Sequence, residues 1–238
     1  MSHRTPAAVL AAAALLSGRI AAADAAADAR ALARDMFKQL IEINTTDSVG
    51  SVTTASEAMA QRFRAAGFPE TDIHLLGATD RTKNLVVRLR GTGLRKPILL
   101  IGHLDVVEAR REDWTTDPFQ LVVKDGYYYG RGTRDMKNGE AIMAATLIRM
   151  KKEGYRQDRD IILALTAGEE SGRNNGVAWL GKNQRALIDA EFVLNHDGNG
   201  VASDHGKPLY VSVIASEKVY ADFQLSVTNP GGHSSLPV

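Results

Sequence analysis

The sequence contains no cysteine among its 238 residues. Without thiols the chain cannot form a disulfide scaffold, a thiolate nucleophile, a cysteine-ligated zinc finger or an iron–sulfur site. Any metal ion must therefore be held by histidine, aspartate and glutamate side chains.

The chain also has little net charge. Its 29 lysine and arginine residues and 28 acidic residues give a formal charge of +1, and 44% of the residues are hydrophobic. Near-neutral charge predicts no general affinity for nucleic acid or anionic membranes, and ordinary apolar content excludes disorder as the main state. A chain of this length can bury a sizeable core as one large domain or two small ones.

Two common catalytic motifs are missing. Gly91-Thr92-Gly93 lacks the third glycine of a dinucleotide-binding loop, and no helix pattern follows it. Ser234 and Ser235 are not surrounded by the G-x-S-x-G pattern of a nucleophile elbow. These absences argue against nicotinamide chemistry and against serine hydrolysis.

The N-terminal segment differs from the rest of the chain. A start that carries Arg4 is followed by an apolar run from Pro6 to Ser17 and by Ala21-Ala22-Ala23. This order is typical of a secretory signal peptide over residues 1–23, and the run is too short for a membrane span. We therefore expect a periplasmic or secreted protein. An alanine-rich helix continuous with the following residues is the alternative interpretation.

Helix and strand patterns alternate after this segment. The spacing of apolar residues predicts helices over 28–43, 54–66, 138–153 and 174–187, and strands over 84–90, 97–101, 160–167, 190–195, 210–214 and 220–228. The continuous apolar runs at 160–167 and 190–195 are typical of strands buried on both faces. The pattern predicts an α/β fold, a three-layer αβα sandwich with a mostly parallel central sheet.

Acidic and imidazole groups follow three of the predicted strands. His103-Leu104-Asp105 follows one strand, Glu169-Glu170 the next and His196-Asp197 the third, while Asp135 lies in a glycine-rich loop before a helix. Ligands of open α/β sheets bind at the edge where the strands end. Carboxylates gathered there repel one another unless a cation lies between them, so the pattern predicts zinc or a similar divalent ion.

Five sequence strings carry a family resemblance. GHLDVV, WTTDPF, DGYYYGRGTRDMKNG, TAGEESG and NPGGHSSLP occur in this order. From about residue 30 to its end, the sequence resembles the two-zinc metallopeptidases that include glutamate carboxypeptidases, aminoacylases, desuccinylases and carnosine-type dipeptidases. The resemblance implies two Zn²⁺ ions in a complete site, with cobalt or manganese as alternatives. It also implies a small peptide or N-acyl amino acid substrate, whose amide bond is hydrolysed by a metal-activated water.

The resemblance also implies a set of metal ligands. His103 and Asp197 would bind one ion, Glu170 would bind the other, and Asp135 would bridge both. His196, beside Asp197, is the alternative ligand at its position.

Three further residues receive roles from the same resemblance. Glu169 would be the general base that takes a proton from the water. Asp105 would orient His103 by accepting its free ring N–H. His233 would be a lid histidine that reaches the active site of a partner subunit and steadies the developing oxyanion. An exposed turn histidine is the alternative for His233.

The resemblance implies a domain organisation as well. Residues 24–215 are expected to form the N-terminal part of a metal-binding catalytic domain, and residues 216–238 to begin an inserted α+β lid domain through which the full-length protein forms a homodimer. The family's last metal-binding histidine has no counterpart before Val238, so the sequence looks like the front part of a longer enzyme. An inactive or folding-defective metal-binding fragment is the alternative hypothesis.

Overall fold

A computed structural model describes residues 27–197, 201–211, 221, 223–228 and 231–232. The predicted signal segment and His233 lie outside these residues. The chain divides into two units, residues 1–198 and 199–238, so the boundary predicted between residues 215 and 216 falls inside the second unit. Among the helices of the described part, none is long and apolar enough to cross a membrane.

Five strands form the central sheet of the first unit, in the order β1-β2-β6-β3-β7. Their bounds are Ile73–Gly77 for β1, Lys83–Leu89 for β2, Ile98–His103 for β3, Ile161–Thr166 for β6 and Phe192–Asn195 for β7. β3 pairs in parallel with β6 and with β7, whereas β2 is antiparallel to both β1 and β6. β1, β3, β6 and β7 therefore point the same way, which confirms the predicted α/β fold with a mostly parallel sheet.

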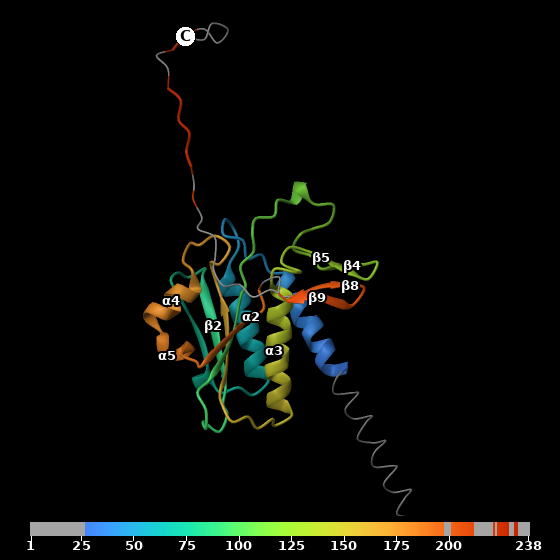
Figure 1. Cartoon of the computed structure of the whole chain (residues 1–238), viewed down its shortest axis with the longest axis vertical. Helices are drawn as coiled ribbons and strands as arrows, with labels where there is room; N and C mark the ends of the chain where they lie inside the picture. Colours follow the sequence, from blue (N-terminus) through green and yellow to red (C-terminus); the bar gives the residue numbers. More distant parts are fainter. Residues whose placement is uncertain (1–26, 198–200, 212–220, 222, 229–230, 233–238) are drawn as a thin grey trace, which may run out of the picture. The chain divides into compact units, whose positions relative to one another are not determined.

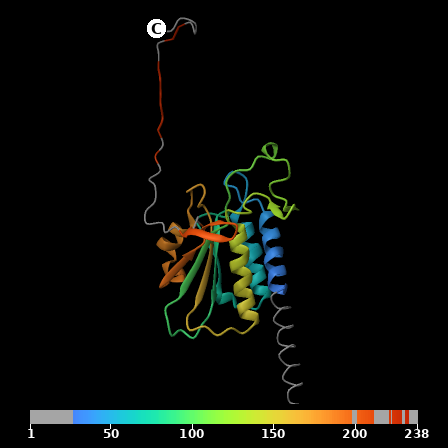
Figure 2. The same cartoon turned by 45° about the vertical axis from the view of Figure 1, so that its right-hand side comes forward.

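Helices cover both faces of this sheet (Figure 1, Figure 2). A helix over residues 27–41, α2 (Val52–Ala65) and α3 (Lys137–Lys152) pack on one face. The second face carries α4 (Gly176–Asn183) and α5 (Arg185–Ile188). The layers are those of an αβα sandwich.

Strand β6 lies at the centre of both cores. Leu163 and Leu165 belong to the larger apolar cluster, which also contains Phe63 of α2, whereas Ile162 and Ala164 belong to the smaller one. Successive side chains of a strand point to opposite faces, so a continuous apolar run fills two cores at once. The prediction of a strand buried on both faces is confirmed for this segment.

The predicted helix over residues 174–187 is interrupted. Gln184 has φ −142° and ψ 36°, which is not helical, and it separates α4 from α5. Two short 3₁₀ turns, Glu70–Asp72 and Arg111–Asp113, complete the helical elements described in this unit.

The prediction that the last strand of this sheet is buried on both faces is wrong. Phe192, Val193 and Leu194 of β7 are 53%, 58% and 54% exposed. β7 lies at the edge of the sheet, and among the described residues its strand pairing is with β3 alone. An apolar run specifies a strand, but its burial depends on what packs against it.

Two short hairpins were not predicted. β4 (Val122–Lys124) and β5 (Tyr127–Tyr129) join through Asp125 and Gly126, which have φ of 52° and 80°. An Asp-Gly pair with two positive φ angles is a common two-residue hairpin turn, so this dipeptide was the missed signal.

In the second unit, β8 (Val201–Asp204) pairs with β9 (Lys207–Val211). β9 overlaps the predicted strand at 210–214. The predicted strand at 220–228 is not seen in its described residues, since residues 223–228 belong to no strand. Phe223, Leu225 and Val227 are each more than 90% exposed.

Candidate metal centre

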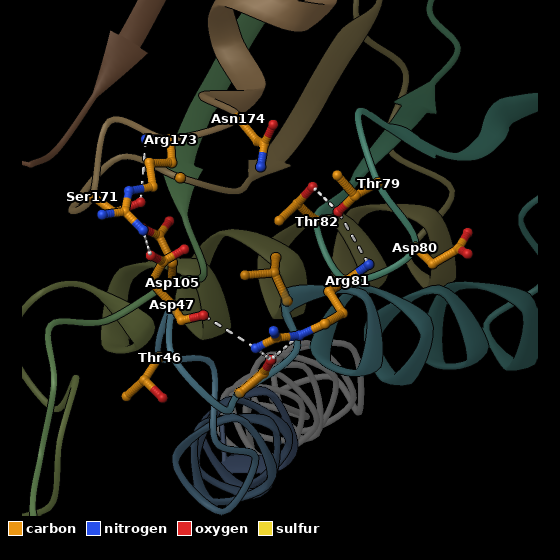
Figure 3. Close-up of a pocket in the computed structure, with 13 residues that line it drawn as sticks. Thr46, Asp47, Thr79, Asp80, Arg81, Thr82, Asp105, Ser171, Arg173 and Asn174 are labelled. Carbon is orange, nitrogen blue, oxygen red and sulfur yellow. Dashed lines mark hydrogen bonds and ion pairs between the residues drawn. The ribbon is translucent and has the colours of Figure 1, made fainter.

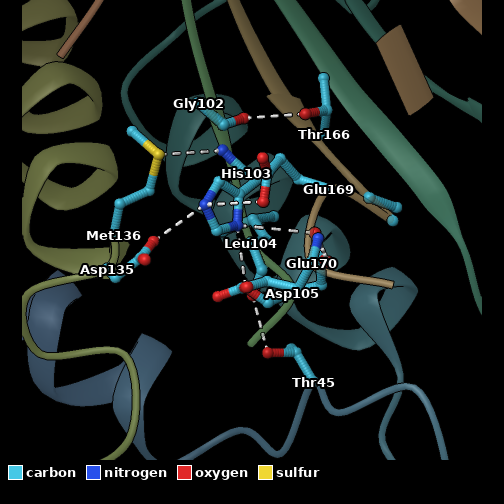
Figure 4. Close-up of polar contacts among 12 residues, drawn as sticks. Thr45, Gly102, His103, Leu104, Asp105, Asp135, Met136, Thr166, Glu169 and Glu170 are labelled. Carbon is cyan, nitrogen blue, oxygen red and sulfur yellow. Dashed lines mark hydrogen bonds and ion pairs between the residues drawn. The ribbon is translucent and has the colours of Figure 1, made fainter. Parts of the chain in front are cut away.

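The carboxyl ends of three parallel strands position the centre. His103 is the last residue of β3, Glu169 and Glu170 follow β6, and Asp197 follows β7, while Asp135 comes just before α3. Because β3, β6 and β7 are parallel, their ends meet at one edge of the sheet. Figure 4 shows the histidine ring with carboxylates on either side of it.

Three carboxylates face one nitrogen of His103. The side chain is 3% exposed, and its Nε2 lies 3.0 Å from Asp135 Oδ1, 3.6 Å from Asp197 Oδ2 and 3.8 Å from Glu169 Oε2. Among the described residues this buried Nε2 has no hydrogen-bond partner. A ring nitrogen that faces acidic oxygens without a hydrogen bond has the surroundings of a metal ligand.

The ligand atoms also meet a distance criterion for metal binding. One atom from each of His103, Asp135 and Asp197 lies within 4.8 Å of the others, and the same holds for His103, Glu169 and Glu170. The structure therefore brings together all four predicted ligands and the predicted base. His196 is in neither group; its ring lies against Gly139 at the start of α3.

Asp105 contacts the centre differently from the sequence expectation. The His103 Nδ1 lies 3.0 Å from the backbone carbonyl oxygen of Asp105 and 3.6 Å from its carboxylate Oδ1. The nearest acceptor for the ring N–H is therefore the backbone, and a proton on Nδ1 leaves Nε2 free to bind a metal. The carboxylate Oδ2 instead accepts the Glu170 backbone N–H at 2.9 Å.

The charges at this edge are poorly compensated. Burial raises the pKa of Glu169, and the nearby Asp197 raises it further while His103 opposes the rise. Burial and the charge of Asp135 likewise raise the pKa of Glu170. Burial acts to lower the pKa of His103, but Asp105 and the other carboxylates raise it above its ordinary value. A bound cation would relieve this repulsion, so the residues present fit a metal ion.

Sequence analysis missed two ionisable side chains on the first turn of α3. Lys137 and Glu140 are fully buried, and the Lys137 Nζ donates to the backbone carbonyls of Leu40 and Ile43 at 2.9 Å each. Burial lowers the pKa of Lys137 to about 7 and raises that of Glu140 well above its ordinary value. The signal was the buried stripe of α3, since Ala141 lies on the same side of the helix.

A cavity of about 420 Å³ adjoins the centre at Asp105. Figure 3 shows Arg81 and Arg173 on its wall. Arg81 Nε donates to the Gly50 carbonyl at 2.8 Å, and Arg173 Nη1 lies 3.5 Å from Asp47 Oδ2. The Arg81 contact joins the loop between β1 and β2 to the loop that contains Asp47, and the Arg173 contact joins the Asp47 loop to the loop that follows Glu170.

The comparison with family models decides the identity. The model described as Peptidase family M20/M25/M40 matches residues 99–233, more than half of the chain. The chain belongs to this family. The matched residues include all seven to which the sequence analysis gave a role at the site.

Curated relatives of this M20 chain agree with that assignment. The probable succinyl-diaminopimelate desuccinylase of Staphylococcus aureus strain Mu50 is 34% identical over 174 residues, which cover 71% of this chain and 40% of the relative. The probable carboxypeptidase S-like 2 of Dictyostelium discoideum is 35% identical over 157 residues, 60% of this chain and 28% of the relative. The chain thus spans less than half the length of these relatives.

Solved structures share the fold. Human carnosine dipeptidase 1 has a TM-score of 0.58 and 19% identity, with 74% of this chain and 41% of that chain covered. An M20 family metallo-carboxypeptidase of Sulfolobus solfataricus has a TM-score of 0.60 and 16% identity, with 71% and 38% covered. The predicted family resemblance is confirmed.

Proposed function

We propose that this M20 protein is a zinc-dependent hydrolase of amide bonds in small peptides or N-acyl amino acids. The observation that carries the proposal is the buried His103 Nε2, which three carboxylates face at 3.0–3.8 Å. Membership of a peptidase family and a relative named as a desuccinylase support the two substrate classes.

In this proposal the ligands divide between two ions. His103, Asp135 and Asp197 would hold one, and Asp135 and Glu170 would contribute to the other. The grouped ligand atoms of the first three residues support the first set, and Glu170 lies in a second group with His103 and Glu169. Zinc suits a set of imidazole and carboxylate donors, and cobalt or manganese are alternatives. When bound, the ions polarise the scissile carbonyl and make the attacking water more acidic.

The side chains around the ligands then move the proton and hold the loops. Glu169 accepts the proton of the attacking water and delivers it to the leaving amine. The Asp105 carbonyl fixes the ring of His103, and the Asp105 carboxylate fixes the backbone of Glu170. Together these contacts keep the base and the ligands at one edge of the sheet.

The remaining sequence hypotheses fall on residues that the structure does not describe. Export through residues 1–23, a homodimer formed through residues after 216, and a His233 that reaches a partner's active site stay predictions. Mixing His233→Ala and Glu169→Gln subunits of the full-length protein tests the last of these, because restored activity requires a site built from two subunits.

The proposed function can be tested by metal depletion. Purified full-length protein is treated with a chelator, and hydrolysis of dipeptides and of N-succinyl and N-acetyl amino acids is followed before and after zinc is returned. We expect activity to be lost and regained. Hydrolysis that is equally fast without metal would contradict the proposal.

Two neighbouring variants identify the ligand from β7. Asp197→Asn should lower zinc affinity, because it removes a charged oxygen 3.6 Å from His103 Nε2. His196→Gln is the matched control and should retain zinc, since its ring lies against Gly139. The reverse result would give the ligand role to His196.

A further inference from the structure

We propose that Lys137 is a positioning residue that aligns the Asp135 loop with the segment that follows His103. The proposal rests on the proposed function, because alignment matters only if Asp135 and His103 share a metal ion. It assigns a task to a buried cation that the hydrolytic mechanism itself does not use.

Lys137 first fixes the end of the helix over residues 27–41. Its side chain is fully buried, and its Nζ donates to the carbonyls of Leu40 and Ile43 at 2.9 Å each. The last carbonyls of a helix have no partner within the helix, and buried ones must find a donor elsewhere. A single amine from a distant part of the sequence thus binds one carbonyl of the last turn, that of Leu40, and the Ile43 carbonyl just beyond the helix end.

Lys137 also closes the loop that carries Asp135. Its backbone N–H donates to the Gly132 carbonyl at 3.0 Å. Gly132 has φ +84°, and a Cβ there would come within 3.1 Å of the lysine Cδ. The lysine stem therefore lies directly over Gly132, and Asp135 sits in the short loop between these two residues.

The fixed helix end is tied in turn to the segment after His103. Two residues beyond Ile43, the Thr45 hydroxyl donates to the Leu104 carbonyl at 2.7 Å, and Val106 N–H donates to the Thr45 carbonyl at 3.4 Å. A chain of short contacts thus runs from Asp135 through Lys137 and Thr45 to the residue that follows His103. These contacts therefore connect the loop of Asp135 to the segment of His103, and the side chains of these two residues lie 3.0 Å apart.

The chain offers a matched control at the opposite edge of the sheet. Gln157 is 8% exposed, and its Nε2 donates to the backbone carbonyls of Leu89 and Arg90 at 3.4 and 3.1 Å. Gln157→Met and Lys137→Met each replace a buried donor to two carbonyls with the same unbranched apolar side chain. Only the lysine contacts lead to the metal ligands.

The experiment measures Zn²⁺ affinity by chelator competition, the visible spectrum of the Co²⁺-substituted protein, and urea unfolding of the metal-free protein. We expect both variants to lower the urea midpoint. Lys137→Met should also weaken Zn²⁺ binding about tenfold or more and change the Co²⁺ spectrum, as loss of a ligand-orienting contact typically does. Gln157→Met should keep the wild-type affinity and spectrum.

Equal Zn²⁺ affinity in wild type and Lys137→Met overturns the proposal. An equal loss of Zn²⁺ affinity in Gln157→Met and Lys137→Met also overturns it, because the affinity would then depend only on the stability of the fold. If Lys137→Met does not fold, Thr45→Val breaks the next contact of the same chain with a side chain of the same shape. Weaker Zn²⁺ binding by Thr45→Val than by Gln157→Met then supports the proposal, and unchanged binding overturns it. Failure of the wild type to bind metal contradicts the proposed function itself and this inference with it.

Discussion

Carboxylates lie at both ends of the parallel strands of the central sheet, but their surroundings differ. Those at the start of the strands are paired with arginine, and those at the end of the strands surround a histidine. At the edge where β3, β6 and β7 begin, each of four carboxylates lies within 3.0 Å of an arginine nitrogen: Asp160 with Arg88, Asp72 with Arg90, Asp158 with Arg95 and Glu191 with Arg159. At the edge where these strands end, Asp135, Glu169 and Asp197 all face one ring nitrogen of His103.

The pKa directions follow this difference. Burial acts to raise the pKa of Asp160, but the Gly91 N–H and the Arg88 guanidinium lower it below its ordinary value. Burial raises the pKa of Glu169 and Glu170, and their neighbours do not reverse the rise. Acidic residues at strand ends are therefore not informative by themselves. What marks the second edge as a site is that three carboxylates gather around one buried ring nitrogen of His103.

The largest expected effect is the loss of turnover in Glu169→Gln. The amide keeps the shape of the side chain but cannot accept a proton, so kcat should fall by about 10²–10⁴-fold while the metal content stays unchanged. Glu191→Gln, at the opposite edge, should leave kcat unchanged. Turnover and metal content of both variants give the comparison, and a near-normal kcat in Glu169→Gln would show that another group is the base.

Next in size is the loss of metal from Glu170→Gln. Removing one charged ligand should weaken zinc binding about 10-fold or more, because the other ligands hold the ion less well. Asp158→Asn is the control that removes a carboxylate from the arginine-paired edge. Chelator competition measures both affinities; equal affinities would remove Glu170 from the ligand set.

At the arginine-paired edge, Asp160→Asn should affect stability and not metal binding. Loss of its charged hydrogen bonds should cost about 1–2 kcal/mol of unfolding free energy near pH 7. The folded-state pKa is depressed, so this stabilisation is present above the ordinary value of 3.8 and is lost as the pH falls through the folded-state value. Urea unfolding at pH 7 and at pH 3 tests this. If Asp160→Asn loses as much unfolding free energy at pH 3 as at pH 7, the stabilisation does not come from the charged Asp160 carboxylate.

The smallest effect is expected for Asp158→Asn. Its ion pair with Arg95 is 47% and 64% exposed on the two side chains, so solvent screens it. The variant should lose no more than about 0.5 kcal/mol of stability. If Asp158→Asn loses more stability than Asp160→Asn, then the burial of an ion pair does not determine how much it contributes to stability here.

The sequence predicted most of the sheet and the neighbourhood of the site because both depend on local patterns. Apolar runs indicate strands, and a polar residue directly after a parallel strand is carried to a known edge of the sheet. Thus His103, Glu169 and Asp197 could be placed together from strand ends alone. Asp135, which follows no strand, was placed from its glycine-rich loop before a helix, and only its bridging role came from the family resemblance.

The remaining features depend on contacts between distant residues. The apolar run of β7 reads like that of β6, yet β7 is an exposed edge strand because of the sheet order. Lys137 looks like a solvated helix residue until Leu40 and Ile43 are known to lie beside it. Residue type also could not show that the backbone of Asp105, and not its carboxylate, would accept from His103.

That last contact makes the histidine resistant to mutation at its neighbour. A backbone carbonyl survives any substitution at position 105, so the acceptor for the ring N–H of His103 persists in every variant that keeps the local chain path. A change of side chain at this position reaches the centre through the Glu170 peptide instead. Substitutions at position 105 should therefore affect the two predicted ligands differently: the imidazole of His103 is held by a backbone atom that all amino acids share, and the Glu170 loop by the carboxylate of Asp105.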